Sequence, residues 1–219
     1  GVEMVNGKEI TDIEALKKDY DYVVLAVGAS EQGVLKLEAG DTMNALDFLA
    51  RFKATEGKVE LGKNVVVIGG GNTAMDTARA AKRNAGVEKV SLVYRRTRRY
   101  MPADEEELVM AVEDGVEFAE LLAPVKLENG VLYCKKMVLG DMDASGRRGV
   151  VETDETVEVP ADTVIAAVGE KVPGAFYESF GIALDSRRRP QVNQETLETS
   201  VKGVYVAGDG LYGPATVVE

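Results

Sequence analysis

The 219-residue sequence lacks histidine entirely and contains a single cysteine, Cys134. Without histidine the chain cannot build a Ser-His-Asp or Cys-His catalytic arrangement or a histidine metal site. With one cysteine it can form neither a CxxC redox pair nor a four-thiolate metal cluster within itself. We expect Cys134 to be a small core residue rather than a redox thiol. A single thiol is typical of a reducing compartment, so we expect a cytoplasmic protein.

Long apolar runs and an excess of positive charge are also missing. Runs such as Val65–Ile68 are far too short to span a membrane. The 26 lysines and arginines are outnumbered by 37 aspartates and glutamates, which gives a formal net charge of −11. Such an acidic surface repels phosphate backbones and anionic lipids, so we expect neither nucleic acid nor a membrane as a partner. Because the sequence begins with Gly1 and ends abruptly, we expect it to be a piece of a longer protein.

The remaining pattern is that of an α/β protein in which β-branched runs alternate with helical segments. Strands are predicted at Tyr22–Val27, Asn64–Ile68, Val90–Tyr94, Thr163–Val168 and Val201–Ala207. Helices are predicted at Leu46–Phe52, Asn72–Asn84 and Asp104–Glu113. The apolar runs of the first two strands predict burial on both faces of a parallel sheet. Alternation between Val116 and Val159 predicts an antiparallel meander laid against that sheet.

The most specific signal is a glycine turn between a predicted strand and a predicted helix. It reads Gly-Gly-Gly-Asn-Thr-Ala, which has the G-x-G-x-x-A spacing of a Rossmann dinucleotide-binding turn. In that motif Gly69 permits the tight turn, Gly71 leaves room for a pyrophosphate, and Ala74 lets the helix pack closely on the strand. The N–H groups at the helix start then face the phosphates. We therefore predict, against a purely structural turn, that a dinucleotide is bound by Gly69, Gly70, Gly71, Asn72, Thr73 and Ala74.

Four arginines follow the next predicted strand, in the order Arg95-Arg96-Thr97-Arg98-Arg99. An NAD site normally carries an acidic residue about 20 residues after the turn, whereas arginines suit a 2′-phosphate. We therefore expect NADP(H) rather than NAD(H), with Arg95 and Arg96 on the 2′-phosphate. The alternative is a solvated basic turn paired with residues 104–107. We expect the acidic helix at 104–113 to be solvated surface rather than a docking face.

Several segments of the sequence together resemble one family. They are GKNVVVIGGGNTAMDTARAAKR, then VSLVYRRTRRYMPADEEE and AVEDGVEF, then PADTVIAAVGE, and finally TSVKGVYVAGDGLYGPATVVE. Over nearly the whole chain this combination resembles the small, β-type subunit of NADPH-dependent glutamate synthase and its FAD- and NAD(P)-dependent relatives. Within that group the resemblance is closest to the type named for a selenate reductase subunit.

The resemblance implies two dinucleotide-binding domains, with an NADP-binding domain inserted into an FAD-binding domain. It places residues 1–60 and 170–219 in a partial FAD-binding domain and residues 61–169 in the NADP-binding domain. Asp209 matches the family's acid that hydrogen-bonds the flavin ribitol, although a structural turn is the competing interpretation of residues 208–210. The cofactor-binding residues that it adds are Gly28, Gly169, Gly208, Asp209, Ala215 and Thr216.

The resemblance also implies a reaction for the complete protein. Hydride passes from NADPH to FAD, and electrons move on to iron–sulfur clusters or to a partner oxidoreductase subunit, without an acid, base or nucleophile from the chain. The family's first FAD fingerprint, another G-x-G-x-x-G, is absent from this sequence, as are the cysteines for clusters. We therefore expect the isolated chain to bind NADP(H), to retain little or no FAD and to be inactive alone.

Three alternatives stay open at this point. A disulfide reductase of the thioredoxin-reductase type would need two cysteines near the nucleotide turn, and residues 72–104 contain none. A flavin monooxygenase would use the same glycine turns. A nucleotide-binding module without catalysis would bind the dinucleotide but would not turn it over.

Overall fold

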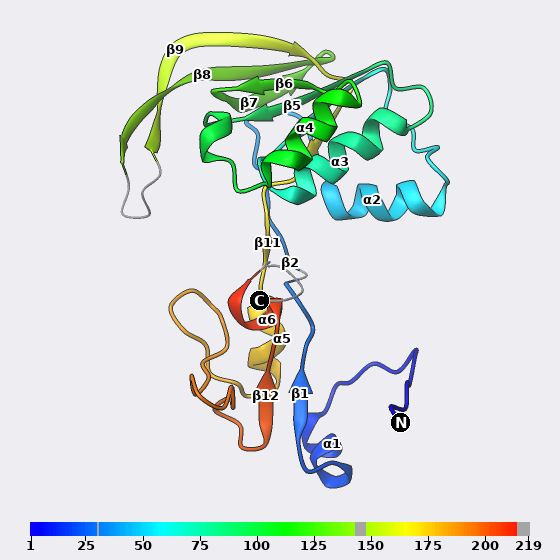
Figure 1. Cartoon of the computed structure of the whole chain (residues 1–219), viewed down its shortest axis with the longest axis vertical. Helices are drawn as coiled ribbons and strands as arrows, with labels where there is room; N and C mark the ends of the chain where they lie inside the picture. The colour runs from blue at the N-terminus through cyan, green and yellow to red at the C-terminus, as the bar shows by residue number, and fades with distance from the viewer. Residues whose placement is uncertain (30, 143–147, 214–219) are drawn as a thin grey trace. The chain divides into compact units, whose positions relative to one another are not determined.

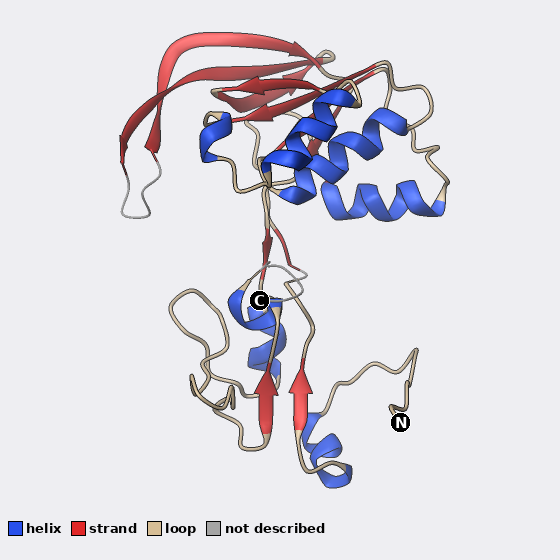
Figure 2. Ribbon diagram, viewed as in Figure 1, coloured by secondary structure: helices blue, strands red, loops and turns tan. Residues whose placement is uncertain are grey.

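The computed structural model describes residues 1–29, 31–142 and 148–213, and Figures 1 and 2 show its helices and strands. The chain divides into two compact units, residues 1–31 with 170–219 and residues 32–169. This division differs from the sequence-based one at residues 32–60, which belong to the larger unit. The reason is that α2 (Ala45–Ala54) buries Phe48 in the core of that unit. Two short strands, β2 (Glu31–Gln32) and β11 (Glu170–Lys171), lie where the chain passes between the units.

The larger unit is built on a five-stranded sheet in the order β3-β10-β4-β5-β6, with every neighbouring pair parallel. Its strands are β3 (Met43–Asn44), β4 (Asn64–Ile68), β5 (Lys89–Tyr94), β6 (Glu117–Glu120) and β10 (Thr163–Ala166). Strand β4 is central and pairs with β10 on one side and β5 on the other. The α/β, Rossmann-like fold that the sequence predicts is therefore confirmed.

Helices cover one face of this sheet (Figure 2). They are α2, α3 (Asn72–Arg83) and α4 (Glu105–Glu113), and the short 3-10 helix η1 (Arg98–Tyr100) precedes α4. Val65 and Val67 of β4 lie in the core that these helices form with the sheet. Val66 and Ile68 lie in a second core on the opposite face. Burial on both faces explains the continuous apolar run of β4, as the sequence predicts.

The second core is closed by an antiparallel sheet. Its three strands are β7 (Leu122–Glu128), β8 (Val131–Met142) and β9 (Arg148–Pro160). Leu132 and Cys134 of β8 are fully buried in that core. The predicted meander is thus present, but it begins at Leu122 and not at Val116. The preceding residues, 117–120, instead pair in parallel with β5.

Among its described residues, the smaller unit has a two-stranded parallel sheet and three short helices. They are α1 (Ile13–Asp19), β1 (Val23–Leu25), α5 (Gly174–Ser179), β12 (Val204–Val206) and α6 (Asp209–Tyr212). In the register of β1 and β12, Val24 lies opposite Tyr205. Core residues of all three helices, such as Ile13 and Tyr177, pack with the buried residues of the two strands. Within the described residues, no helix is both long and apolar enough to cross a membrane.

The prediction that Tyr22–Val27 is buried on both faces is wrong. Val23 and Leu25 are buried, whereas Val24, which points to the opposite face, is 60% exposed. The core of the smaller unit lies on one face of this sheet, and among the described residues no second layer covers the other. Within the described residues the outer edge of β1 is unpaired, while β12 is bridged by Glu198 at Tyr205.

Candidate functional site

The glycine turn lies at the carboxyl end of β4, the central strand of the larger unit. The Gly69 amide donates to the carbonyl of Val93 on β5 at 3.1 Å. Helix α3 begins at Asn72 with Gly71 as its N-cap, and the buried Ala74 donates its amide to the Gly71 carbonyl at 2.9 Å. The structure therefore brings Gly69–Ala74 into the strand–turn–helix arrangement on which the dinucleotide prediction depends.

The three glycines of the turn have different surroundings. A β-carbon on Gly69 would collide with the carbonyl oxygen of Ala167, and one on Gly70 would collide with the ring of Tyr94. A β-carbon on Gly71 would meet a single side-chain atom, at 4.0 Å, which is ordinary van der Waals contact. Packing within the protein thus explains the first two glycines but not Gly71. The motif places a pyrophosphate beside this glycine.

The start of α3 has the electrostatic character of an anion site. The first turn contains no acidic residue, and the N-cap residue Gly71 has no side chain to cap the helix. Asn72 is exposed and Thr73 is half-buried at this helix start. The positive end of the helix dipole and the backbone N–H groups therefore face the space beside Gly71.

The arginines that follow β5 differ in what they contact. Among the described residues, the exposed side chains of Arg95 and Arg99 have no ion-pair partner. Arg96 is half-buried, and its Nε donates to a backbone carbonyl of β9 at 3.0 Å. Arg98 forms an ion pair with Glu105 at 2.8 Å. Pairing with the acidic segment, the alternative to phosphate binding, thus accounts for one of the four arginines.

We call residues 95–104 the arginine segment. Backbone contacts fix it to its neighbours. The Tyr94 hydroxyl donates to the Tyr100 carbonyl at 2.8 Å, and the Ala103 amide donates to the Gly70 carbonyl of the glycine turn at 3.0 Å. A depression of about 630 Å³ is lined by the arginine segment, the start of α4 and Glu120. The arginines therefore lie on an ordered segment bonded to the turn itself.

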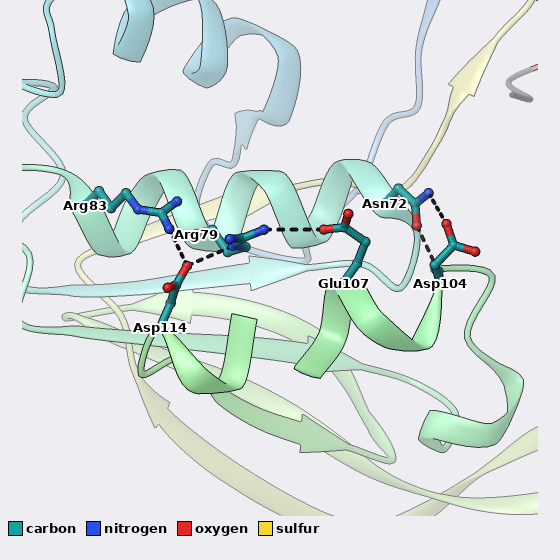
Figure 3. Close-up of polar contacts among 6 residues, drawn as sticks. All are labelled: Asn72, Arg79, Arg83, Asp104, Glu107 and Asp114. Carbon is teal, nitrogen blue, oxygen red and sulfur yellow. Dashed lines mark hydrogen bonds and ion pairs between the residues drawn. The ribbon is translucent and has the colours of Figure 1, made fainter. Parts of the chain in front are cut away.

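Helices α3 and α4 are joined by side chains at both ends (Figure 3). At the start of α3, Asn72 Nδ2 donates to Asp104 Oδ2 at 3.2 Å, and the Asp104 amide donates to Asn72 Oδ1 at 3.0 Å. At the far end, Arg79 Nε and Arg83 Nη2 donate to the Asp114 carboxylate at 2.8 and 2.6 Å. The hydrogen bond from Arg79 holds the pKa of Asp114 below its ordinary value of 3.8.

Sequence reasoning missed these contacts. Asn72 and Asp104 are 32 residues apart, and Arg79 and Asp114 are 35 apart. Periodicity along one segment carries no information about a partner so distant. The only signal in the sequence is the acidic start of α4 itself, which the sequence analysis interprets as solvated surface.

In the smaller unit, two predicted glycines follow the paired strands β1 and β12. Gly28 and Gly208 have φ angles of 71° and 65°, and a β-carbon on either would meet nothing within 4 Å. Asp209 follows directly as the first residue of α6. Because Leu25 and Val206 are aligned in register, all three predicted residues lie at the same end of the sheet. The predicted residues Ala215 and Thr216 lie outside the described residues.

Gly169 belongs to the larger unit, three residues beyond the end of β10. Its carbonyl accepts a hydrogen bond from the Gly33 amide at 2.8 Å, and its φ is 97°. It thus lies beyond the same edge of the parallel sheet as the glycine turn. The described residues contain no group of three or more Cys, Asp or Glu side chains that could hold a metal ion.

Two buried groups are not part of the predicted site. The hydroxyl of Tyr177 is fully buried, has no hydrogen-bond partner among the described residues and lies against Gly210, where a β-carbon would collide with it. Burial raises the pKa of Tyr177. Cys134 is also fully buried, and burial raises the pKa of its thiol to about 12. A thiol with such a pKa is a core group, as the sequence predicts.

The central strand of the parallel sheet leads through a glycine turn into a helix. The unit that contains this sheet is inserted in the sequence between the two segments of the smaller unit. This arrangement is that of the class of proteins with two dinucleotide-binding folds. Residues 1–219 match the family described as pyridine nucleotide-disulphide oxidoreductase, and the chain belongs to this family. The relation to pyridine nucleotide oxidoreductases therefore covers residues 1–219.

Two curated relatives show the closeness of this relation. The oxidoreductase-type protein YgfK of Escherichia coli O157:H7 is 43% identical over 212 residues, which cover 94% of this chain and 20% of YgfK. The NADPH glutamate synthase small chain of Escherichia coli (strain K12) is 35% identical over 246 residues, covering 100% of this chain and 52% of that protein. The resemblance to the glutamate synthase group is thereby confirmed. The chain spans between a fifth and about half of these curated relatives.

The fold of the chain is similar to that of a solved structure. FprA from Mycobacterium tuberculosis in complex with NADPH superimposes with a TM-score of 0.74, covering 94% of this chain and 62% of FprA. Its sequence identity is 20%, so this likeness concerns the fold alone.

Proposed function

We propose that residues 32–169 bind NADP(H) and that the complete protein passes a hydride from NADPH to FAD. Electrons then move on to a partner subunit or to iron–sulfur clusters in regions outside this chain. Family membership makes the protein an oxidoreductase of the pyridine nucleotide type. The nucleotide, the flavin and the onward route are the proposal.

The observation that carries the proposal is that a β-carbon on Gly71, unlike one on Gly69 or Gly70, would collide with no atom of the chain. Packing within the chain requires a glycine at positions 69 and 70 but not at 71, and α3 begins there without an acidic residue in its first turn. A pyrophosphate beside Gly71 would accept hydrogen bonds from the turn and would lie at the positive end of the helix. Packing within the chain does not require a glycine at position 71, whereas a phosphate group bound close to the backbone there would require one.

The choice of NADP(H) over NAD(H) rests on the arginine segment. A 2′-phosphate carries charge that a guanidinium can bind through two parallel hydrogen bonds. Arg95 is exposed and, among the described residues, has no ion-pair partner, so its guanidinium is available. We assign Arg95 as the main ligand of the 2′-phosphate. Arg96 is a weaker candidate because its Nε already donates to the backbone of β9.

The smaller unit would supply part of an FAD site. Gly28 and Gly208 leave open space at the carboxyl end of β1 and β12, and Asp209 begins the helix that follows. These residues fit the close approach of a nucleotide to the backbone, and Asp209 would bond the flavin ribitol. When bound, the flavin supplies the hydride acceptor of the reaction. The residues of this chain bind and orient the cofactors, and Gly169 and Thr73 belong to the proposed nucleotide contacts.

A second function, nucleotide binding without turnover, is favoured for the chain on its own. Within the described residues, the sheet of the smaller unit has only two strands, its β1 edge is unpaired, and Val24 on one face is exposed. The unit that would hold the flavin is therefore incomplete. Disulfide reduction is not favoured, because the single cysteine is buried. An artificial dye separates the two functions: NADPH-dependent dye reduction by the full-length protein supports the enzyme, and binding without reduction supports the module.

Calorimetric titration of the chain with NADPH and, separately, NADH tests the nucleotide assignment. We expect a preference for NADPH that falls at least tenfold in Arg95→Ala, equivalent to about 1.4 kcal/mol. Arg51→Ala is the matched control, because Arg51 is an exposed arginine of α2 in the same unit. Equal binding of the two nucleotides, or an equal effect of both variants, would contradict the assignment. An absorption spectrum of the same purified chain should lack a stoichiometric flavin band.

A further inference from the structure

We propose that Asp104 is a positioning residue of the nucleotide site. Through Asn72 it holds the arginine segment against the start of α3, so that the 2′-phosphate and the pyrophosphate are bound at a fixed separation. This inference rests on the proposed binding of NADP(H) and adds to it a residue that does not itself touch the nucleotide.

Asn72 and Asp104 are paired reciprocally. The Asn72 amide donates to Asp104 Oδ2 at 3.2 Å, and its carbonyl oxygen accepts from the Asp104 amide at 3.0 Å (Figure 3). Both polar ends of the Asn72 side chain are thereby engaged by one residue. Asn72 is the first residue of α3, next to Gly71, and Asp104 ends the arginine segment. The contact thus joins the two parts of the site that would hold two different phosphates.

The packing of α3 against α4 does not need this contact. The far ends of α3 and α4 are joined by Arg79, Arg83 and Asp114. Between the ends, buried residues such as Ala78 and Ala111 lie in the same core. Asp104 is exposed and occupies the N-cap position of α4 without capping it through its side chain. Its side chain therefore contributes to the position of the arginine segment more than to the fold.

The charge of Asp104 does not itself favour phosphate binding. A carboxylate close to the start of α3 repels a phosphate, so charge alone would disfavour an acid at position 104. The side chain at position 104 must supply an oxygen that accepts the hydrogen bond from Asn72, and either a carboxylate or an amide of the same length can do so. An asparagine at position 104 would keep an acceptor for that bond and remove the repulsion. Substitution at position 104 can therefore separate the effect of the hydrogen bond from the effect of the negative charge.

The experiment compares the ratio of the NADH to the NADPH dissociation constant in variants of the chain. Asp104→Ala and Asp104→Ser both remove the carboxylate that accepts from Asn72, and serine retains a preferred N-cap residue if alanine disturbs α4. We expect both to lower the ratio at least fivefold, because NADH does not use the arginine segment. Asp104→Asn should keep the ratio within twofold or raise it. Glu106→Ala, which removes an exposed charge from the same helix, should leave it unchanged.

A double variant tests whether Asp104 acts through its partner. In an Asn72→Ala background, Asp104→Ala should have no further effect on the ratio, because the bond is already lost. A ratio in Asp104→Ala and Asp104→Ser within twofold of the unaltered chain would overturn the inference while leaving NADP(H) binding intact. A ratio that falls equally in Asp104→Asn would also overturn it. Failure of the unaltered chain to bind either nucleotide would overturn the proposed function, and this inference with it.

Discussion

Gly69 packs so closely against the carbonyl oxygen of Ala167 that no side chain fits between them. This contact joins the glycine turn after β4 to the segment after β10, and it explains a glycine at position 69 without any ligand. Gly71, two residues further, has no such neighbour. Folding and ligand binding are therefore expected to depend on different glycines of one motif.

Alanine substitutions at positions 69 and 71 should destabilise the chain to different extents. Gly69→Ala forces a methyl group against the Ala167 backbone and is expected to lower the free energy of unfolding by roughly 1–3 kcal/mol or more. Gly71→Ala should cost less than about 1 kcal/mol, because its φ of −98° suits alanine and only an ordinary contact is added. Urea unfolding followed by circular dichroism measures both. Equal destabilisation would mean that packing requires both glycines.

The Asp114 carboxylate should make the stability of the chain sensitive to acid. Because the hydrogen bond from Arg79 lowers its pKa below 3.8, its contribution is fully present above that value. It is lost as the pH falls through the lowered pKa. Asp114→Asn should therefore unfold at lower urea concentration than the unaltered chain at about pH 7, and the difference should shrink at about pH 3. A difference that is independent of pH would show that the carboxylate charge is not involved.

Cys134 should be unreactive while the protein is folded. Its thiol is fully buried, and its pKa is raised to about 12, so almost no thiolate forms near neutral pH. A chromogenic disulfide reagent should label the folded chain slowly and should label one thiol per chain in denaturant. Rapid labelling of the folded chain would contradict the core position of Cys134.

Two tyrosines, both buried, should respond differently to loss of the hydroxyl. Tyr177→Phe removes a hydroxyl that has no partner among the described residues, so stability should be unchanged or increase by about 1 kcal/mol. Tyr94→Phe is the contrast, because that hydroxyl donates to Tyr100 and its loss should cost about 0.5–1.5 kcal/mol. The two unfolding free energies are measured by urea denaturation. A clear loss in Tyr177→Phe would reveal a hydrogen bond to that hydroxyl.

The sequence was sufficient to predict elements that are consecutive along the chain. The apolar run before Gly69 and the small residues after it predict β4, the turn and α3, because strand, turn and helix are consecutive. The same kind of run fails for Tyr22–Val27, whose Val24 is exposed. An apolar run reports a tendency to be buried, but the layer that would cover it comes from other parts of the chain.

The candidate site shows the same limit. The spacing of the arginines places them after β5, yet it does not reveal that Arg98 pairs with Glu105 while Arg95 has no ion-pair partner among the described residues. The bonds between Asn72 and Asp104 depend on how α3 and α4 pack together. These contacts decide which arginines are available to a phosphate, and they follow from tertiary structure alone.

Titration of the unaltered chain and of Gly71→Ala with NADPH tests the central claim most directly. The claim is that the space beside Gly71 holds the pyrophosphate of NADP(H). We expect the unaltered chain to bind NADPH and Gly71→Ala to bind it at least tenfold more weakly, with both equally folded by circular dichroism. Equal NADPH affinity of the two folded proteins would show that the nucleotide does not occupy the glycine turn.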